Sequence, residues 1–167
     1  TITAGSVTFG GTVNSDFNTR ALTINASGDT VFSGAVGGFA ALSNITTDAG
    51  GSTRILGGSV RTAGDQSYGD AVVLGSDTTI TGNDVTFGST IDSSTTATPS
   101  ALTVNSVGSG TTNFAGDVGG SKALKSITTD ASGTTRVGAN MTTTGGMTFN
   151  DVVLVYSDSV MRDTGTT

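Results

Sequence analysis

Apolar and polar residues alternate along most of this chain in runs of only a few residues. Leu22-Thr23-Ile24 and Thr79-Ile80-Thr81 are typical, because successive side chains of an extended backbone point to opposite sides. Glycine, asparagine, aspartate and serine separate the runs and are typical of turns. The pattern therefore predicts short β-strands joined by turns and no helices.

A recurring motif lies within this alternation. A large aromatic or aliphatic residue is followed a few positions later by a second apolar residue, and these are the side chains large enough to fill a narrow interior otherwise made of small residues. The predicted core consists of Phe9, Val13, Phe32, Val36, Tyr68, Val72, Phe87, Ile91, Phe114, Val118, Phe149 and Val153.

The chain also repeats itself at an interval of about 80 residues. Val7-Thr8-Phe9-Gly10 returns as Val85-Thr86-Phe87-Gly88, and Ile45-Thr46-Thr47-Asp48 returns as Ile127-Thr128-Thr129-Asp130. The interval drifts by a residue or two, as loop insertions on a repeating scaffold produce, and the main insertion lies at residues 92 to 100. We interpret residues 1–80 and 81–167 as two copies in a single β-solenoid segment of a longer chain.

Several motifs per copy give a spacing of about 20 residues, close to one coil of a β-solenoid. The expected fold is thus all-β, with about seven or eight stacked coils paired through parallel strands. The interval from Ile55 to Tyr68 is too short for a full coil, so the pattern allows either three or four coils per copy.

Composition supports this fold and excludes several kinds of chemistry. Gly, Ser and Thr number 26, 20 and 33 of 167 residues, and all thirteen acidic residues are Asp. Because this composition is poor in residues that favour helices, a helical protein is excluded. Only 12% of residues are charged and there is one Pro, which argues against disorder. The absence of Cys and His excludes disulfides, zinc sites built from these residues and a Ser-His-Asp triad. The net charge of −6 argues against nucleic acid as a partner, and no apolar run is long enough to predict membrane insertion.

The order of motifs resembles that of a known group of proteins. Three motifs are similar to the β-strand repeats of large bacterial surface and secreted proteins, such as autotransporter passenger domains and filamentous-haemagglutinin-like exoproteins. They are Ala21-Leu22-Thr23-Ile24-Asn25, Val31-Phe32 with Val36-Gly37-Gly38, and Ile45-Thr46-Thr47-Asp48. The resemblance implies a right-handed parallel β-helix, export to the bacterial cell surface or the exterior, and a role as a stalk or adhesive fibre. It implies no catalytic residues. The last copy departs from the pattern, with Tyr156 in the place of Gly75 and Arg162 in the place of Thr81.

The acidic residues are the first candidates for a site. Asp48 and Asp130 each follow Thr-Thr singly, so we expect turn residues that bond their own backbone and not calcium ligands. Glycoside cleavage needs two carboxyl groups close together, and the nearest pairs in the sequence are Asp65 with Asp70 and Asp77 with Asp84. No Trp and only two Tyr accompany them as sugar platforms, so we expect no enzyme.

Threonine supplies the second candidate. A Thr-x-Thr pattern predicts Thr side chains on a common strand face, as in ice-binding proteins; it occurs at Thr1-Ile2-Thr3, Thr79-Ile80-Thr81 and Thr142-Thr143-Thr144. The high strand propensity of Thr alone also accounts for these residues. Arg54 and Arg136 are expected to be solvated cations. Gly37-Gly38 and Gly119-Gly120 are expected to be turns and not phosphate loops, because no Lys-Ser/Thr pair follows them.

The sequence thus favours a non-catalytic stalk or adhesive-fibre segment, without cofactor or metal. Its expected partners are neighbouring repeats, or other copies stacked end to end, and a glycan or cell surface. The alternative is a module that binds a glycan or ice surface through one Thr-rich face. A whole-gene sequence with many further copies favours the stalk.

Overall fold

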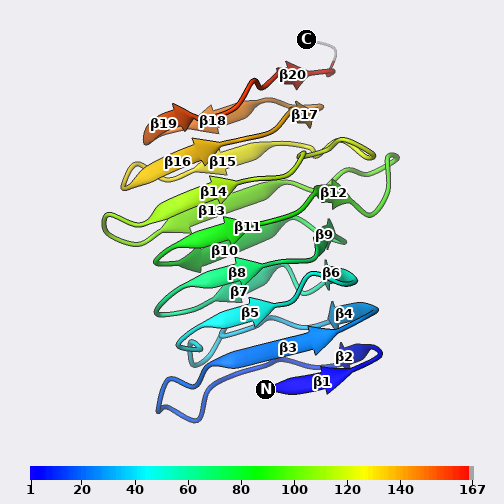
Figure 1. Cartoon of the computed structure of the whole chain (residues 1–167), viewed down its shortest axis with the longest axis vertical. Coiled ribbons are helices and arrows are strands. Elements are labelled where there is room, and N and C mark those ends of the chain that lie inside the picture. The colour runs from blue at the N-terminus through cyan, green and yellow to red at the C-terminus, as the bar shows by residue number, and fades with distance from the viewer. Residues whose placement is uncertain (166–167) are drawn as a thin grey trace.

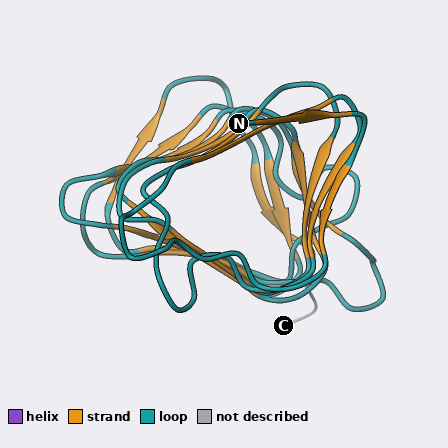
Figure 2. Cartoon of the chain, turned by 90° about the horizontal axis from the view of Figure 1, so that it is seen from below, coloured by secondary structure: helices purple, strands orange, loops and turns teal. Residues whose placement is uncertain are grey.

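The strands wind into a right-handed parallel β-helix whose coils stack along one axis, as the computed structural model in Figure 1 shows. The model describes residues 1–165, and these contain short strands and no helix. Viewed along the axis, the coils have a three-sided cross-section (Figure 2). We call the three sides face 1, face 2 and face 3.

Face 1 is an unbroken sheet that runs the length of the helix. Its eight strands therefore mark about seven turns, which confirms the predicted solenoid and its number of coils. In order they are β1 (Ile2–Ala4), β3 (Leu22–Ala26), β5 (Ile45–Thr47), β8 (Gln66–Tyr68), β11 (Val85–Phe87), β14 (Thr111–Phe114), β16 (Thr134–Val137) and β19 (Val152–Val155).

Faces 2 and 3 are shorter sheets that isolated parallel bridges extend. Face 2 contains β2 (Val7–Phe9), β4 (Asp29–Phe32), β6 (Ser52–Ile55), β9 (Ala71–Leu74) and β12 (Ile91–Ser93), and continues through Val118 to β17 (Met141–Thr143) and β20 (Met161–Asp163). Face 3 starts with bridges from Val13 through Val36 to Val60, and contains β7 (Ser59–Arg61), β10 (Thr78–Gly82), β13 (Leu102–Ser106), β15 (Ile127–Thr129) and β18 (Met147–Phe149).

The coils vary in length while the inward side chains stay in register. Phe87 pairs with Phe114, which is 27 residues further on, whereas Val137 pairs with Val155, 18 residues further on. Loops between strands absorb the difference, since lengthening a surface loop costs little free energy.

The core is a column of side chains along the axis. Phe9 stacks on Phe32 with ring centroids 5.2 Å apart, and Tyr68, Phe87 and Phe114 form a second ladder with spacings of 5.3 and 5.4 Å. Eight of the predicted core residues are fully buried, namely Phe32, Val36, Tyr68, Val72, Phe87, Ile91, Phe114 and Val118. The other four, Phe9, Val13, Phe149 and Val153, pack against the core but are half-buried, because each is covered by a coil on one side only.

The sequence repeat and the coil do not coincide. The equivalent residues Phe9 and Phe87 lie on different faces, since β2 is the first strand of face 2 and β11 is the fifth strand of face 1. One copy therefore covers four turns less one face, or three and two-thirds coils, and neither of the predicted numbers, three and four, is right. Every position of the second copy is turned by one face relative to the first.

Each copy packs one bulky side chain against a glycine of the adjacent coil, but the two copies place the bulky residue in different coils. Gly75 lies against Leu56, and a Cβ at Gly75 would collide with Cδ2 of that leucine. In the second copy Gly138 takes the place of Leu56 and Tyr156 the place of Gly75, and the Tyr156 ring covers Gly138. The large and small partners are exchanged, so Tyr156 fits the last coil although it departs from the repeat.

The buried aromatic ladder leads to the first prediction. Phe32→Ala should lower the free energy of unfolding by about 3–5 kcal/mol, because it removes a fully buried ring that neighbouring coils hold on both sides. Chemical denaturation monitored by circular dichroism measures the loss. Phe39→Ala, at a ring that is 77% exposed, is the control and should change stability little. Equal losses in the two variants would contradict the core assignment.

Candidate functional site

Aspartate side chains join adjacent coils of the helix. Ten of the thirteen accept a hydrogen bond from a residue in the preceding or following coil: Asp29, Asp48, Asp65, Asp70, Asp77, Asp84, Asp92, Asp117, Asp130 and Asp151. The expectation that these residues bond their own backbone is therefore wrong for most of them. The chain needs its acids as acceptors between coils.

Asp48 and Asp130, the equivalent residues after Thr-Thr, show this role most clearly. Asp48 Oδ1 accepts from the Ala26 amide at 2.9 Å, and Asp130 Oδ1 accepts from the Ser106 amide at 2.9 Å. Burial disfavours ionisation of Asp130, but hydrogen bonds from Ser132 and Ser106 outweigh it and lower its pKa. No group of three or more acids that fits a metal ion occurs in residues 1–165.

The predicted carboxylate pairs do not share a cleft. Asp65 and Asp70 lie at opposite ends of β8, where Asp65 accepts from the Asp84 amide and Asp70 from the amides of Gly50 and Gly51. Asp77 and Asp84 are likewise separated by β10. Within residues 1–165 no pocket lies beside either pair.

Asp70 is the most buried of these acids, with 2% of its surface exposed. Besides the two glycine amides it accepts a hydrogen bond from the inward-facing Thr53 hydroxyl at 3.1 Å. The second copy repeats the arrangement, since Asp151 accepts from the hydroxyl of Thr135 at 2.9 Å. Threonine therefore occurs inside the coil as well as outside, and a carboxylate accepts from the buried hydroxyls of Thr53 and Thr135.

The three Thr-x-Thr motifs lie on three different faces, so the predicted common face is wrong. Thr3 belongs to β1 on face 1, Thr81 to β10 on face 3 and Thr142 to β17 on face 2. The shift of one face per copy separates Thr3 from its equivalent Thr81, and Thr142 belongs to a different position of the repeat. A hydroxyl column of one residue per coil does run along face 3, through Ser59, Thr79, Thr103, Thr128 and Thr148. It is one residue wide, because the adjacent column contains Arg61, Thr81 and Asn105.

The other candidates are surface and turn residues. Arg54 is half-buried on face 2, and Arg136 is exposed on face 1 with its guanidinium 5.0 Å from the centroid of the Tyr156 ring. Gly37 and Gly119 have φ angles of 69° and 68°, which favour glycine, and both form turns.

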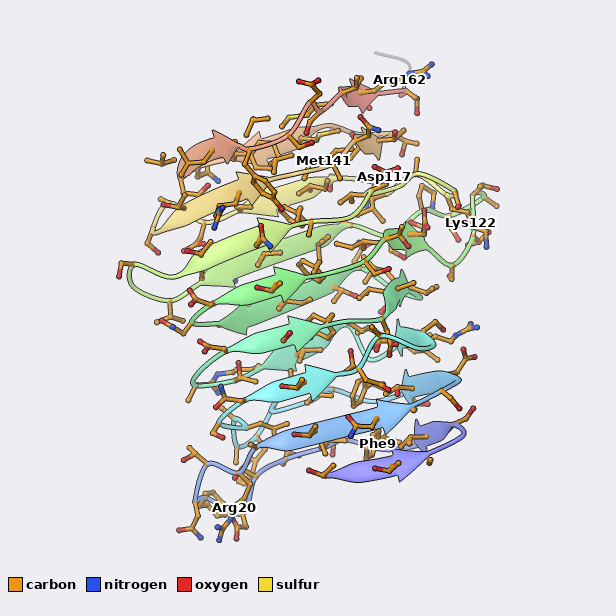
Figure 3. All side chains as sticks on the ribbon, viewed as in Figure 1. Phe9, Arg20, Asp117, Lys122, Met141 and Arg162 are labelled. Carbon is orange, nitrogen blue, oxygen red and sulfur yellow. The ribbon has the colours of Figure 1, made fainter. Side chains whose placement is uncertain are left out.

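Two loop regions project from the helix and are built on the same plan. We call residues 14–20 with 37–41 the aromatic corner, and the equivalent residues 92–100 with 119–123 the polar corner. Asn14 Oδ1 accepts from the Phe39 amide at 2.9 Å in the first, and Asp92 Oδ1 accepts from the Ser121 amide at 2.9 Å in the second. Figure 3 shows Arg20 of the aromatic corner and Lys122 of the polar corner on opposite sides of the molecule.

A serine closes the outer loop of each corner. Ser15 Oγ accepts from the Arg20 amide at 2.9 Å, and Ser93 Oγ accepts from the Ser100 amide at 2.9 Å. The main-chain frame is thus conserved between the two corners, whereas the side chains at their tips differ. Binding residues commonly occupy such loops on a rigid scaffold.

The tip of the aromatic corner exposes two phenyl rings. Phe17 and Phe39 are each 77% exposed and meet edge to face, with centroids 5.5 Å apart and planes at 79°. Phe17 has a φ angle of 70°, which is unusual for a bulky residue.

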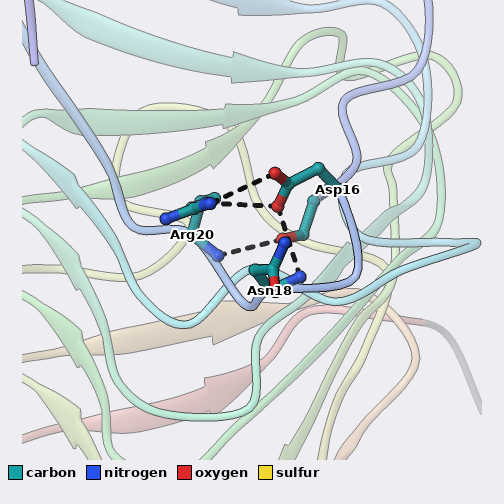
Figure 4. Close-up of polar contacts among 4 residues, drawn as sticks. Asp16, Asn18 and Arg20 are labelled. Atoms are coloured by element: carbon teal, nitrogen blue, oxygen red, sulfur yellow. Dashed lines mark hydrogen bonds and ion pairs between the residues drawn. The ribbon is translucent and has the colours of Figure 1, made fainter.

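An ion pair holds the same loop. Arg20 Nε donates to Asp16 Oδ1 at 3.1 Å, the Asn18 amide donates to the same oxygen at 3.2 Å, and the hydrogen bond from Arg20 lowers the Asp16 pKa most (Figure 4).

The sequence patterns did not single out Phe17 and Phe39. A signal was nevertheless present, because five of the seven phenylalanines belong to the core motif and these two do not. An aromatic residue outside the inward-facing pattern of a solenoid must lie on the surface.

Comparison with known proteins identifies no relative: no family model, no curated protein and no solved structure matches the chain. Among the described residues no helix is long and apolar enough to span a membrane.

The buried carboxylate of Asp70 yields a prediction about stability. Asp70→Ala should lower the free energy of unfolding by at least about 2 kcal/mol, because two amides and the Thr53 hydroxyl lose their acceptor. Urea denaturation measures the loss. Asp77→Ala removes an exposed contact to the Ala101 amide and should cost less. An equal loss in both variants would show that the number of contacts at Asp70 is unimportant.

Asp130 should make stability dependent on pH. Its pKa in the folded chain lies below the ordinary value of 3.8, so its contribution is complete above that pH and is lost as the pH falls through the lower, folded value. Asp130→Asn should flatten the fall in stability below about pH 3.8, because Asn keeps an acceptor and does not titrate. Urea midpoints across this range test it, with Asp158→Asn as control. An unchanged acid limb would disprove the assignment.

Proposed function

We propose that this chain is a non-catalytic segment of a bacterial secreted or cell-surface protein, in which it acts as a rigid spacer or fibre element. The observation that supports the proposal most directly is the junction between the two copies. Tyr68 of the first copy stacks on Phe87 of the second at 5.3 Å, almost the spacing of Phe87 and Phe114 within the second copy. The core continues through the junction, so further copies can extend the same rod.

The turn of one face per copy also suits a spacer. Equivalent surface positions point in different directions in successive copies, so neighbouring copies do not present the same feature side by side. The resemblance of the repeats to those of autotransporter passengers and filamentous-haemagglutinin-like exoproteins supports a bacterial surface or extracellular location. A flat, repetitive binding face is the less favoured design, since its residues would have to recur at every coil.

The internal junction also indicates how two copies of the chain would stack end to end. Strands β8 and β9 are covered by β11 and β12 of the next coil. Their equivalents in the second copy are β18 and β19, which end their sheets within the described residues. The equivalents of β11 and β12 in the first copy are β2 and residues 13–15. Residues from Val7 onward in another copy therefore have the sequence that fits over β18 and β19, and β20 takes the position that β1 of the other copy would occupy.

An alternative function is the binding of a glycan or an ice surface through a Thr-rich face. The hydroxyl column on face 3 favours it, because Thr79, Thr103 and Thr128 follow one another coil by coil. Thermal hysteresis of the chain in freezing buffer distinguishes this function from a spacer. Measurable hysteresis that disappears in Thr103→Lys would favour ice binding.

End-to-end stacking is tested by sedimentation velocity over a concentration series. The chain should form larger species as its concentration rises, since unpaired parallel strands pair with another chain. Val155→Lys should suppress association, because Val155 pairs with the buried Val137 and belongs to the inward column. Val152→Lys, in the outward column of the same strand, is the matched control.

The sedimentation profile can also contradict stacking. A chain that stays monomeric at every concentration, or two variants that associate equally, would show that the terminal coils do not dock as the internal junction does.

A further inference from the structure

The scaffold does not require the two phenyl rings of the aromatic corner. The polar corner has the equivalent hydrogen bond from a main-chain amide to a side-chain oxygen without any aromatic residue, with Ser121 in the place of Phe39. Exposing two large apolar rings to water is unfavourable. Since the rings contribute little to folding at this corner, a contact with another molecule is the remaining use for them.

The size of the patch limits what it can bind. Two phenyl rings offer roughly 300–500 Å², whereas a stable protein–protein interface needs about 800 Å² from each partner. The surroundings add charged and polar groups rather than more apolar surface, since Asp16, Asn18 and Arg20 share the loop of Phe17. A ligand of about the size of one or two rings fits this area better than a folded protein surface.

The chemistry of the loop favours a sugar over a lipid. A pyranose ring has an apolar C–H face that packs on a phenyl ring, and hydroxyl groups that bond to carboxylate, amide and guanidinium groups. Insertion into a bilayer would instead take the Asp16–Arg20 ion pair out of water at a large cost. The net charge of −6 also opposes binding to anionic membranes.

The corner is held in place before any ligand arrives. Asn14 Oδ1 accepts from the amides of both Phe39 and Ala40, which fixes the second loop against the first. Ser15 and the Asp16–Arg20 pair fix the loop that carries Phe17, with its positive φ angle. A preorganised site loses less conformational entropy on binding, and backbone strain of this kind often marks ligand sites.

We infer that the aromatic corner is a carbohydrate-binding subsite that takes one or two sugar rings of a glycan chain against Phe17 and Phe39. The site lies on a projecting loop and not on the Thr column of face 3. It does not depend on the spacer function, because it needs only this one corner of the rod. In a fibre, each copy would present its own corner on a different side, and this chain carries one aromatic and one polar version.

Titration with a panel of hexasaccharides tests the inference. The probes are hexamers of glucose, N-acetylglucosamine, galactose and mannose, added to the full chain labelled for observation of phenylalanine rings by NMR. At least one hexamer should shift the signals of Phe17 and Phe39 with a saturable dependence on concentration. Phe17→Asn combined with Phe39→Ser should weaken binding about tenfold or more, because two ring contacts are lost while Asn tolerates the positive φ angle of residue 17.

Matched variants separate the site from general effects on folding. Phe39→Ser introduces the residue that the polar corner has at this position, so the double variant should keep the circular dichroism spectrum and melting temperature of the parent. Lys122→Ala changes the polar corner and should bind the hexamer as the parent does. Arg20→Ala, which removes the partner of Asp16, should weaken binding while both rings remain.

Three results would overturn the inference. In the first, none of the four hexamers shifts either ring. In the second, the double variant binds as tightly as the parent. In the third, vesicles of phosphatidylcholine and phosphatidylglycerol bind the parent and not the double variant, which would assign the rings to a lipid surface. The sedimentation test of the spacer is independent of all three.

Discussion

Parallel pairing of each coil with the coil beneath it is the constraint on which the rest of this structure depends. A coil has few residues and cannot bury its own apolar side chains, so each inward residue is covered by the equivalent residues above and below. The stacked rings of Tyr68, Phe87 and Phe114 are the clearest case. The half-buried state of Phe9 and Phe149 shows the converse, because these residues have a coil on one side only.

The acidic residues follow from the same constraint. The main-chain groups at the corners of a coil lie outside the sheets and still need partners. A short carboxylate such as that of Asp48 or Asp130 reaches a main-chain amide of the adjacent coil, and eight aspartates act in this way. Asp29 and Asp151 accept from hydroxyl groups of the adjacent coil instead. Glutamate is absent from the chain. Its longer side chain would lose more conformational freedom for the same hydrogen bond. The negative charge is thus largely a consequence of how the coils are joined.

Because the sequence repeat and the coil differ in length, equivalent surface residues of the two copies lie on different faces of the rod. One copy covers three and two-thirds coils, so a conserved core motif produces a surface that turns by one face per copy. The aromatic and polar corners show what this permits. Their frames are equivalent down to the hydrogen bonds of Asn14 and Asp92, yet they project from different sides and carry different tips. Tips can vary without disturbing the core, because no tip side chain lies between two coils.

The sequence by itself determined that the chain is a β-solenoid and which side chains fill it. Alternation and the spacing of Phe32, Val36, Phe114 and Val118 are local properties, and they persist because each coil repeats the same inward pattern. Only the tertiary structure decided which strands lie side by side, since the register across coils depends on loop lengths that no single motif encodes. It therefore decided the shift of one face per copy, the dispersal of the Thr motifs and the partners of Asp70. It also brought Phe17 and Phe39 together, which are far apart in the chain and meet because consecutive coils place their corners next to each other.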